Sequence, residues 1–264
     1  MKIGSDEHKR RFCDQFIASH NRYDPETLAW PDLDNAALAR LRAVPFWPEV
    51  LYTERRAAAI VDAYAATITD PLVREAIQLE GFEEARHANL LRLMIRRYGL
   101  AADERPLEEP GPDLYRAFAD FGYGECLDAF LGFGVFNIAR RSAFLPDPMF
   151  AIFDTLLHEE NRHIVLFVNW MAWEQERRGR GASWLRSAIA AHYYSGQSGG
   201  SSAPSAAGRR RTAAKTSRQR RRAFFSTAFQ FANWSRNAAP NTPVGWQRST
   251  PIWCSPAFCR GSPR

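Results

Sequence analysis

The sequence predicts an all-α protein whose centre is a bundle of four long helices. Segments rich in good helix formers alternate with turns that proline or glycine marks, and no segment shows a convincing strand pattern. A pentapeptide Glu-Glu-x-Arg-His also occurs twice inside these helices, at 83–87 and at 159–163. The 264 residues are 45% hydrophobic, which suffices for one good-sized domain and an appendage.

Six helices are expected, and residues that suit helix ends mark several of their boundaries. Asp70 can cap the second long helix and Pro71 suits its first turn, whereas Gly99 can end it. Residues 101–113 form a polar linker with three prolines, and Leu-Pro-Asp-Pro at 145–148 separates the last two long helices. In chain order the expected ranges are about 8–20, 48–68, 71–98, 114–143, 149–178 and 183–194.

Charge divides the chain into a body and a tail. All 29 acidic residues lie at or before Glu176, and residues 196–264 contain 12 Lys and Arg. The net charge of +6 is therefore the sum of −6 for residues 1–195 (23 − 29) and +12 for the tail (12 − 0). The predicted organisation is an N-terminal helical extension (1–44), a helical bundle (45–195) and a disordered basic tail (196–264).

Cysteine content and hydropathy bear on the compartment. The chain has 4 Cys and no C-x-x-C pair, which argues against a disulfide framework or a zinc ribbon and fits a reducing compartment. The N-terminus is charged and lacks an apolar stretch of signal-peptide length, and no run reaches the ~20 apolar residues of a membrane span. We therefore expect a cytoplasmic protein without a transmembrane segment. A homodimer is compatible with such a bundle, but no particular residue indicates one.

Each copy of the pentapeptide places one Glu and one His on the same helix face. Residues three apart in a helix point the same way, so Glu84 aligns with His87, and Glu160 aligns with His163, in each case among apolar neighbours. One Glu-x-x-His match arises readily by chance on a helix surface, but two matches on apolar faces do not. Burying a carboxylate or an imidazole without a partner is costly, and a shared metal ion removes that cost.

The other charged members of the two copies are Glu83, Arg86, Glu159 and Arg162. We expect them nearer the helix flanks, in local ion pairs worth roughly a few tenths of a kcal/mol each.

The helix before each pentapeptide offers one more carboxylate on an apolar face. Glu54 lies 30 positions before Glu84, and Glu125 lies 35 positions before Glu160. Asp128 is one turn beyond Glu125 and shares its face, so it is a rival ligand or an outer partner of the ligands.

Together these residues resemble the ligand pattern of the ferritin-like superfamily of di-iron carboxylate proteins, without identifying a member family. The resemblance covers roughly residues 45–178 and implies a left-handed four-helix bundle that binds two metal ions between its helices. It also implies that Glu84 and Glu160 bridge the metals and that each histidine caps one. The implied ligands are Glu54, Glu84, His87, Glu125, Glu160 and His163.

Four carboxylates and two imidazoles suit two divalent ions. The −4 charge of the carboxylates balances the ions, and mixed oxygen and nitrogen ligation favours iron or manganese over zinc. We expect two Fe ions, with Mn or a mixed Fe/Mn pair as the alternative. The resemblance implies an O2-activating oxidase or monooxygenase that acts on a small apolar or amphipathic substrate and needs an electron donor. The alternative is a metal-binding bundle without catalytic turnover.

The third long helix contains four glycines, each of which costs about 1 kcal/mol relative to alanine in a helix interior: Gly122, Gly124, Gly132 and Gly134. Either close helix packing or space for a substrate or O2 explains them. In the second case we expect an aromatic lining from Phe121, Phe130, Phe133 and Phe167.

The tail is strongly basic at 208–222, and a nucleic-acid interface is one explanation. Translation in the wrong reading frame explains it better, because acidic residues vanish after Glu176 while Arg, Ser, Pro and Ala dominate, as in GC-rich DNA read out of frame. Permitted codons for residues 224–263, read from their third nucleotide, can encode a sequence with acids and a helical pattern. We therefore expect no nucleic-acid partner and no evolved function for the tail.

A one-nucleotide frameshift near residue 195 can be tested directly on the gene. Sequencing the DNA across codons 190–200 is expected to show that a shift of one nucleotide opens an acid-containing frame with ordinary codon usage. Ordinary codon usage throughout the present frame would contradict the hypothesis.

Overall fold

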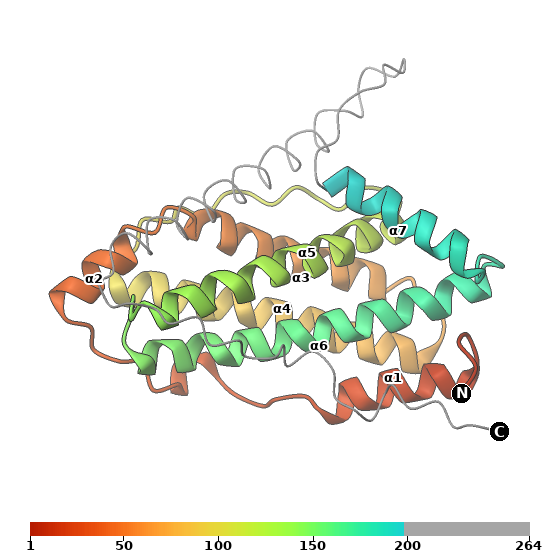
Figure 1. Cartoon of the computed structure of the whole chain (residues 1–264), viewed down its shortest axis with the longest axis horizontal. Helices are drawn as coiled ribbons and strands as arrows, with labels where there is room; N and C mark the ends of the chain where they lie inside the picture. Colours follow the sequence, from red (N-terminus) through yellow and green to blue (C-terminus); the bar gives the residue numbers. More distant parts are fainter. Residues whose placement is uncertain (198–264) are drawn as a thin grey trace, which may run out of the picture.

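The computed structural model describes residues 1–197, which form seven α-helices and one short 3-10 helix, with no strand among them. The predicted all-α class is therefore confirmed for this part of the chain. Figure 1 shows the four longest helices running side by side. They are α3 (Trp47–Ala65), α4 (Pro71–Tyr98), α5 (Leu114–Arg141) and α6 (Asp147–Arg177).

Shorter elements cover the outside of the long helices. α1 (Asp6–Ala18) packs against α6 and α4, and the 3-10 turn η1 (Pro25–Thr27) packs against α4. α7 (Ser183–Gln197) packs against α5. The remaining helix, α2 (Asn35–Arg42), lies between the predicted helices 8–20 and 48–68, in a segment where no helix was predicted. The sequence does contain a suitable N-cap for this helix, because Asp is a preferred residue type at that position. In the structure Asp34 accepts a hydrogen bond from the Ala37 N–H.

Local capping chemistry decides where the long helices begin and end. α4 matches its predicted range: Asp70 accepts from the N–H groups of Leu72 and Val73, and Gly99 ends the helix with a φ of 60°. α3 stops three residues early, at Ala65, where the Thr67 hydroxyl donates to the Tyr64 carbonyl.

The predicted ends of α5 and α6 also shift slightly. α5 stops at Arg141 rather than at 143, because Ala143 has a φ of 48° and cannot continue a helix. α6 begins at Asp147, two residues early, because Pro148 fits the first turn of a helix.

Two apolar clusters lie at opposite ends of the four long helices. Along α4, residues 73–77 belong to the first cluster and residues 88–98 to the second. Along α6 the order is reversed, with 149–153 in the second cluster and 166–173 in the first. Both pentapeptides fall between the clusters, so the fold brings their inner faces together halfway along the bundle.

No helix among residues 1–197 has the length and apolar character needed to cross a membrane. The structure describes no residue after Gln197. The predicted disordered tail and its frameshifted sequence therefore lie outside the described residues.

The glycines of α5 were explained either by close helix packing or by space for a substrate or O2, and different glycines fit different explanations. A Cβ at Gly122 would lie 2.1 Å from the Phe167 ring, so this glycine permits close packing of α5 on α6. A Cβ at Gly132 or Gly134 would meet nothing within 4 Å. The second half of α5 therefore leaves space beside it, whereas the first half does not.

Replacing Gly122 by alanine is expected to destabilise the protein by about 1–3 kcal/mol, because the new methyl group overlaps Phe167. The matched control is Gly134→Ala, which enters open space and should stabilise by up to about 1 kcal/mol through helix propensity. Urea unfolding of both variants tests the pair. A Gly122→Ala protein as stable as the wild type would show that the two helices can move apart freely.

Candidate metal centre

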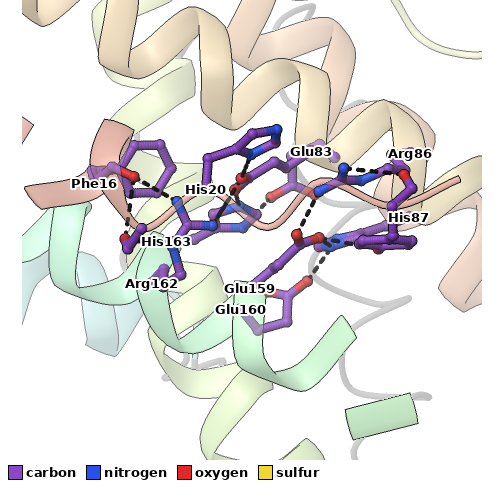
Figure 2. Close-up of polar contacts among 12 residues, drawn as sticks. Phe16, His20, Glu83, Arg86, His87, Glu159, Glu160, Arg162 and His163 are labelled. Carbon is purple, nitrogen blue, oxygen red and sulfur yellow. Dashed lines mark hydrogen bonds and ion pairs between the residues drawn. The ribbon is translucent and has the colours of Figure 1, made fainter. Parts of the chain in front are cut away.

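A buried cluster at the middle of the bundle could hold a metal ion. Glu84 and His87 from α4 meet Glu160 and His163 from α6, and one ligand atom from each lies within 4.8 Å of all the others. The exposed fractions run from 0% at His87 to 6% at Glu160, so water does not solvate these groups. Figure 2 shows His87, Glu160 and His163 in this arrangement.

The two predicted carboxylates from α3 and α5 reach the same interior. The Oε2 atom of Glu54 lies 3.4 Å from Nδ1 of His87. Glu125 and Glu160 line one cavity, and each shifts the pKa of the other. Asp128 lies on the wall of the same cavity. Four of the six predicted ligands thus form the group that could hold a metal, with Glu54 and Glu125 beside it. That all six are ligands, and the choice between Glu125 and Asp128, stays a prediction.

Both histidines turn Nδ1 towards the centre. Nδ1 of His87 lies 3.0 Å from Oε1 of Glu160, and Nδ1 of His163 lies 3.0 Å from Oε1 of Glu84. These facing atoms are buried and lack the geometry of a hydrogen bond. Buried polar atoms in native proteins are normally satisfied. A metal ion between them would satisfy them, so the residues present fit a metal.

The outer nitrogen of each histidine is held by the other pentapeptide. Nε2 of His87 lies 2.9 Å from Oε2 of Glu159, and Nε2 of His163 lies 2.8 Å from Oε2 of Glu83. A ligating histidine typically uses its second N–H in this way, which fixes the ring and its tautomer. The two helices therefore orient each other's histidines.

The arginines complete this crossed pattern. Arg162 of α6 donates from Nη1 to both oxygens of Glu83, at 2.8 and 2.9 Å. Arg86 of α4 donates from Nη2 to Glu159. Figure 2 shows both arginines reaching across to the carboxylate of the neighbouring helix.

The prediction that these four residues lie on the helix flanks in local ion pairs is wrong. The exposed fractions are 0% for Glu83 and Glu159, 7% for Arg86 and 8% for Arg162. Their partners lie on the other helix because α4 and α6 are neighbours, and α1 with the following segment covers their outer side. Breaking such a buried pair costs about 3–5 kcal/mol, far more than a local surface pair.

The N-terminal segment supplies further contacts that sequence reasoning missed. Nδ1 of His20 lies 2.5 Å from Oε1 of Glu83, and the Tyr23 hydroxyl donates to Oε2 of Glu159 at 3.1 Å. The Phe16 carbonyl accepts from Nη2 of Arg162 at 2.6 Å. The extension is therefore part of the centre, and its contacts span 63 to 146 positions of sequence, which no local pattern can indicate.

Burial and charge shift the pKa values of the cluster in different directions. Burial, with the neighbouring carboxylates, raises the pKa of Glu84 to about 8 and raises that of Glu125 well above its usual range. Burial also acts to raise the pKa of Glu160, but the adjacent imidazole of His87 prevails and holds it at about 2.

Burial acts to lower the pKa of each histidine, but the carboxylates around them prevail. The nearby carboxylates of Glu159 and Glu160 raise the pKa of His87, and those of Glu83 and Glu84 raise the pKa of His163. In the metal-free protein, both histidines and the carboxyl groups of Glu84 and Glu125 therefore hold protons more tightly than free side chains do.

A fifth inward carboxylate, Glu80, was also missed. It is 1% exposed and its Oε2 atom has no hydrogen-bond partner. Burial raises its pKa to about 8, so it carries a proton at neutral pH. The signal was present in the sequence, because Glu80 lies one turn before Glu84 on the same face of α4.

Comparison with protein-family models, with curated proteins and with solved structures finds no match to this chain. The resemblance to the ferritin-like superfamily therefore stays a prediction from the sequence.

Removing the N-terminal contacts is expected to weaken metal binding without unfolding the bundle. The double variant His20→Phe with Tyr23→Phe loses both contacts to the carboxylates that orient the ligand histidines, and such outer contacts are typically worth about 10–100-fold in metal affinity. Competition for Mn(II) with a chromophoric chelator measures the change. The matched control is His158→Phe, because His158 is exposed on α6. Unchanged affinity in a folded double variant would contradict the role of the extension.

Proposed function

We propose that residues 45–178 form a ferritin-like di-metal carboxylate protein that binds two Fe ions, or Mn or a mixed Fe/Mn pair. The observation that carries this proposal is the crossed arrangement of the two pentapeptides. Each helix directs one Nδ1 atom and one carboxylate inward, while the other helix fixes the outer nitrogen. A surface or remnant motif has no need of such paired buried support.

Charge balance is compatible with two divalent ions. Four ligand carboxylates carry −4, which two divalent ions neutralise. The buried Glu83 and Glu159 are already compensated by Arg162 and Arg86. An uncompensated negative charge is costly in a low dielectric, so any carboxylate that metal ions do not neutralise must bind a proton.

Protons can take the place of metal ions in the metal-free protein. The pKa values of Glu84, Glu125, His87 and His163 are all raised, so protons on these groups would supply positive charge where metal ions would otherwise supply it. Metal ligands must lose such protons to bind, so metal and protons compete for this site.

The proposed activity is an O2-dependent oxidation of a small apolar or amphipathic substrate, with an electron donor as further partner. Glu54, Glu84, His87, Glu125, Glu160 and His163 would hold the pair of Fe ions, which as Fe(II) would supply the electrons for reducing O2. The chain itself orients the two histidines, holds a proton on the Glu80 carboxyl next to the ligands, and excludes water through the first apolar cluster. A cavity that reaches the ligand carboxylates supports an enzyme over a simple metal-binding protein.

Oxygen consumption tests this proposal. Protein loaded anaerobically with Fe(II) is expected to oxidise the iron on exposure to O2, and the double variant Glu84→Ala with Glu160→Ala should lose both the iron and the reaction. Glu75→Ala is the matched control, because Glu75 lies exposed on α4. Oxidation no faster than in the double variant would contradict the proposal, and retained iron without O2 uptake would favour the metal-binding alternative.

A further inference from the structure

A cavity of about 210 Å³ lies against α3 and α5 and opens onto the candidate metal centre. Its inner wall includes the carboxylates of Glu54, Glu125 and Glu160. Most of the remaining wall is apolar and comes from α2, α3, α5, α6 and the turn before α6. Side chains in this apolar part include Leu41, Trp47, Val135, Phe136, Phe150 and Phe153.

The space lies on one side of the centre. On the other side the first apolar cluster is packed, with Phe118 0% and Trp170 1% exposed. Gly132 belongs to the cavity wall, and a Cβ there would meet nothing within 4 Å, so the glycine leaves the space open.

The aromatic lining predicted from the sequence is wrong in its residues. Phe121 and Phe167 are buried in the first apolar cluster, and Phe130 is 69% exposed. Phe133 does not line this cavity either. The aromatic rings that do line it come from the opposite end of the bundle, because α5 is loosely packed only in its second half.

The ionisable groups of the wall carry mostly one sign of charge. Three of its acids are proposed metal ligands, and Glu49 is paired with Arg105 at 2.9 Å. The other ionisable side chains of the wall include Asp128, Glu108 and one basic residue, Arg56. Glu108 is exposed, so it marks the side on which the cavity meets solvent.

We propose that this cavity binds the substrate of the proposed reaction, and that the substrate is a small molecule with one hydrocarbon group and a neutral or ammonium head. The proposal rests on the proposed function of the metal centre. The apolar wall accepts the hydrocarbon group, and the excess of carboxylates disfavours an anionic head and favours an ammonium head. A volume of about 210 Å³ is below the roughly 300–1,000 Å³ of drug-sized ligand sites, so long-chain lipids and peptides do not fit within it.

Calorimetric titration with three probes of equal chain length tests the ligand class. The probes are 1-octanol, n-octylamine and sodium octanoate, added to Mn(II)-loaded and to metal-free protein. Octanol and octylamine are expected to bind both forms, and octanoate is expected to bind at least about tenfold more weakly. Metal-free protein is needed because octanoate could otherwise bind to the metal itself. Equal affinity for octanoate and octylamine in the metal-free protein would overturn the proposed class.

Two matched glycine variants test the place of binding. Gly132→Leu fills the cavity and should abolish octanol binding, whereas Gly134→Leu makes the same change on the exposed side of α5 and should leave it intact. Glu108→Lys should improve octanoate binding relative to octylamine and leave octanol unchanged. Octanol binding that survives Gly132→Leu would overturn the proposed site.

Metal analysis of the same preparations separates the two proposals. Octanol binding that Gly132→Leu removes, in a protein that takes up no metal, would overturn the proposed function and leave the ligand class of the cavity standing. Metal uptake with no binding of octanol or octylamine would overturn the cavity proposal alone.

Discussion

The crossed ion pairs between α4 and α6 are the constraint on which the rest of the structure depends. Glu83 and Glu159 are both fully buried, and each would be strongly destabilising without the arginine and histidine of the opposite helix. This requirement fixes how α4 and α6 lie along each other. It also gives the N-terminal segment a place, because His20 and Tyr23 complete the contacts of the same two carboxylates.

The two ends of the bundle differ in how closely they pack around the centre. The first apolar cluster packs tightly, with Phe167 against Gly122, and keeps water from one side of the ligands. On the other side, a cavity lined by α3 and the second half of α5 reaches Glu54, Glu125 and Glu160. One side of the centre is thus closely packed, while the other has space for a small molecule. This asymmetry suits the proposed function, in which the site holds metal ions and still reaches a substrate.

Sequence patterns predict structural features that depend on residues close together in the chain. The boundaries of α4 follow from Asp70 and Gly99, and the inward Glu-His pairs follow from helical spacing. The roles of Glu83 and Glu159 could not be predicted in this way, because their arginine partners lie 79 and 73 positions away. Contacts of that kind depend on which helices become neighbours. Glu80 differs from them, because its spacing of four residues from Glu84 is enough to predict that it lies on the inner face of α4.

Titration of the metal-free protein with Mn(II) in weakly buffered solution at pH 7 tests the central claim most directly, because it counts ions and protons together. The account predicts two ions bound per chain with release of protons, because the pKa values of Glu84, Glu125, His87 and His163 are raised and metal competes with those protons. Binding of a single ion, or of two ions without proton release, would contradict it.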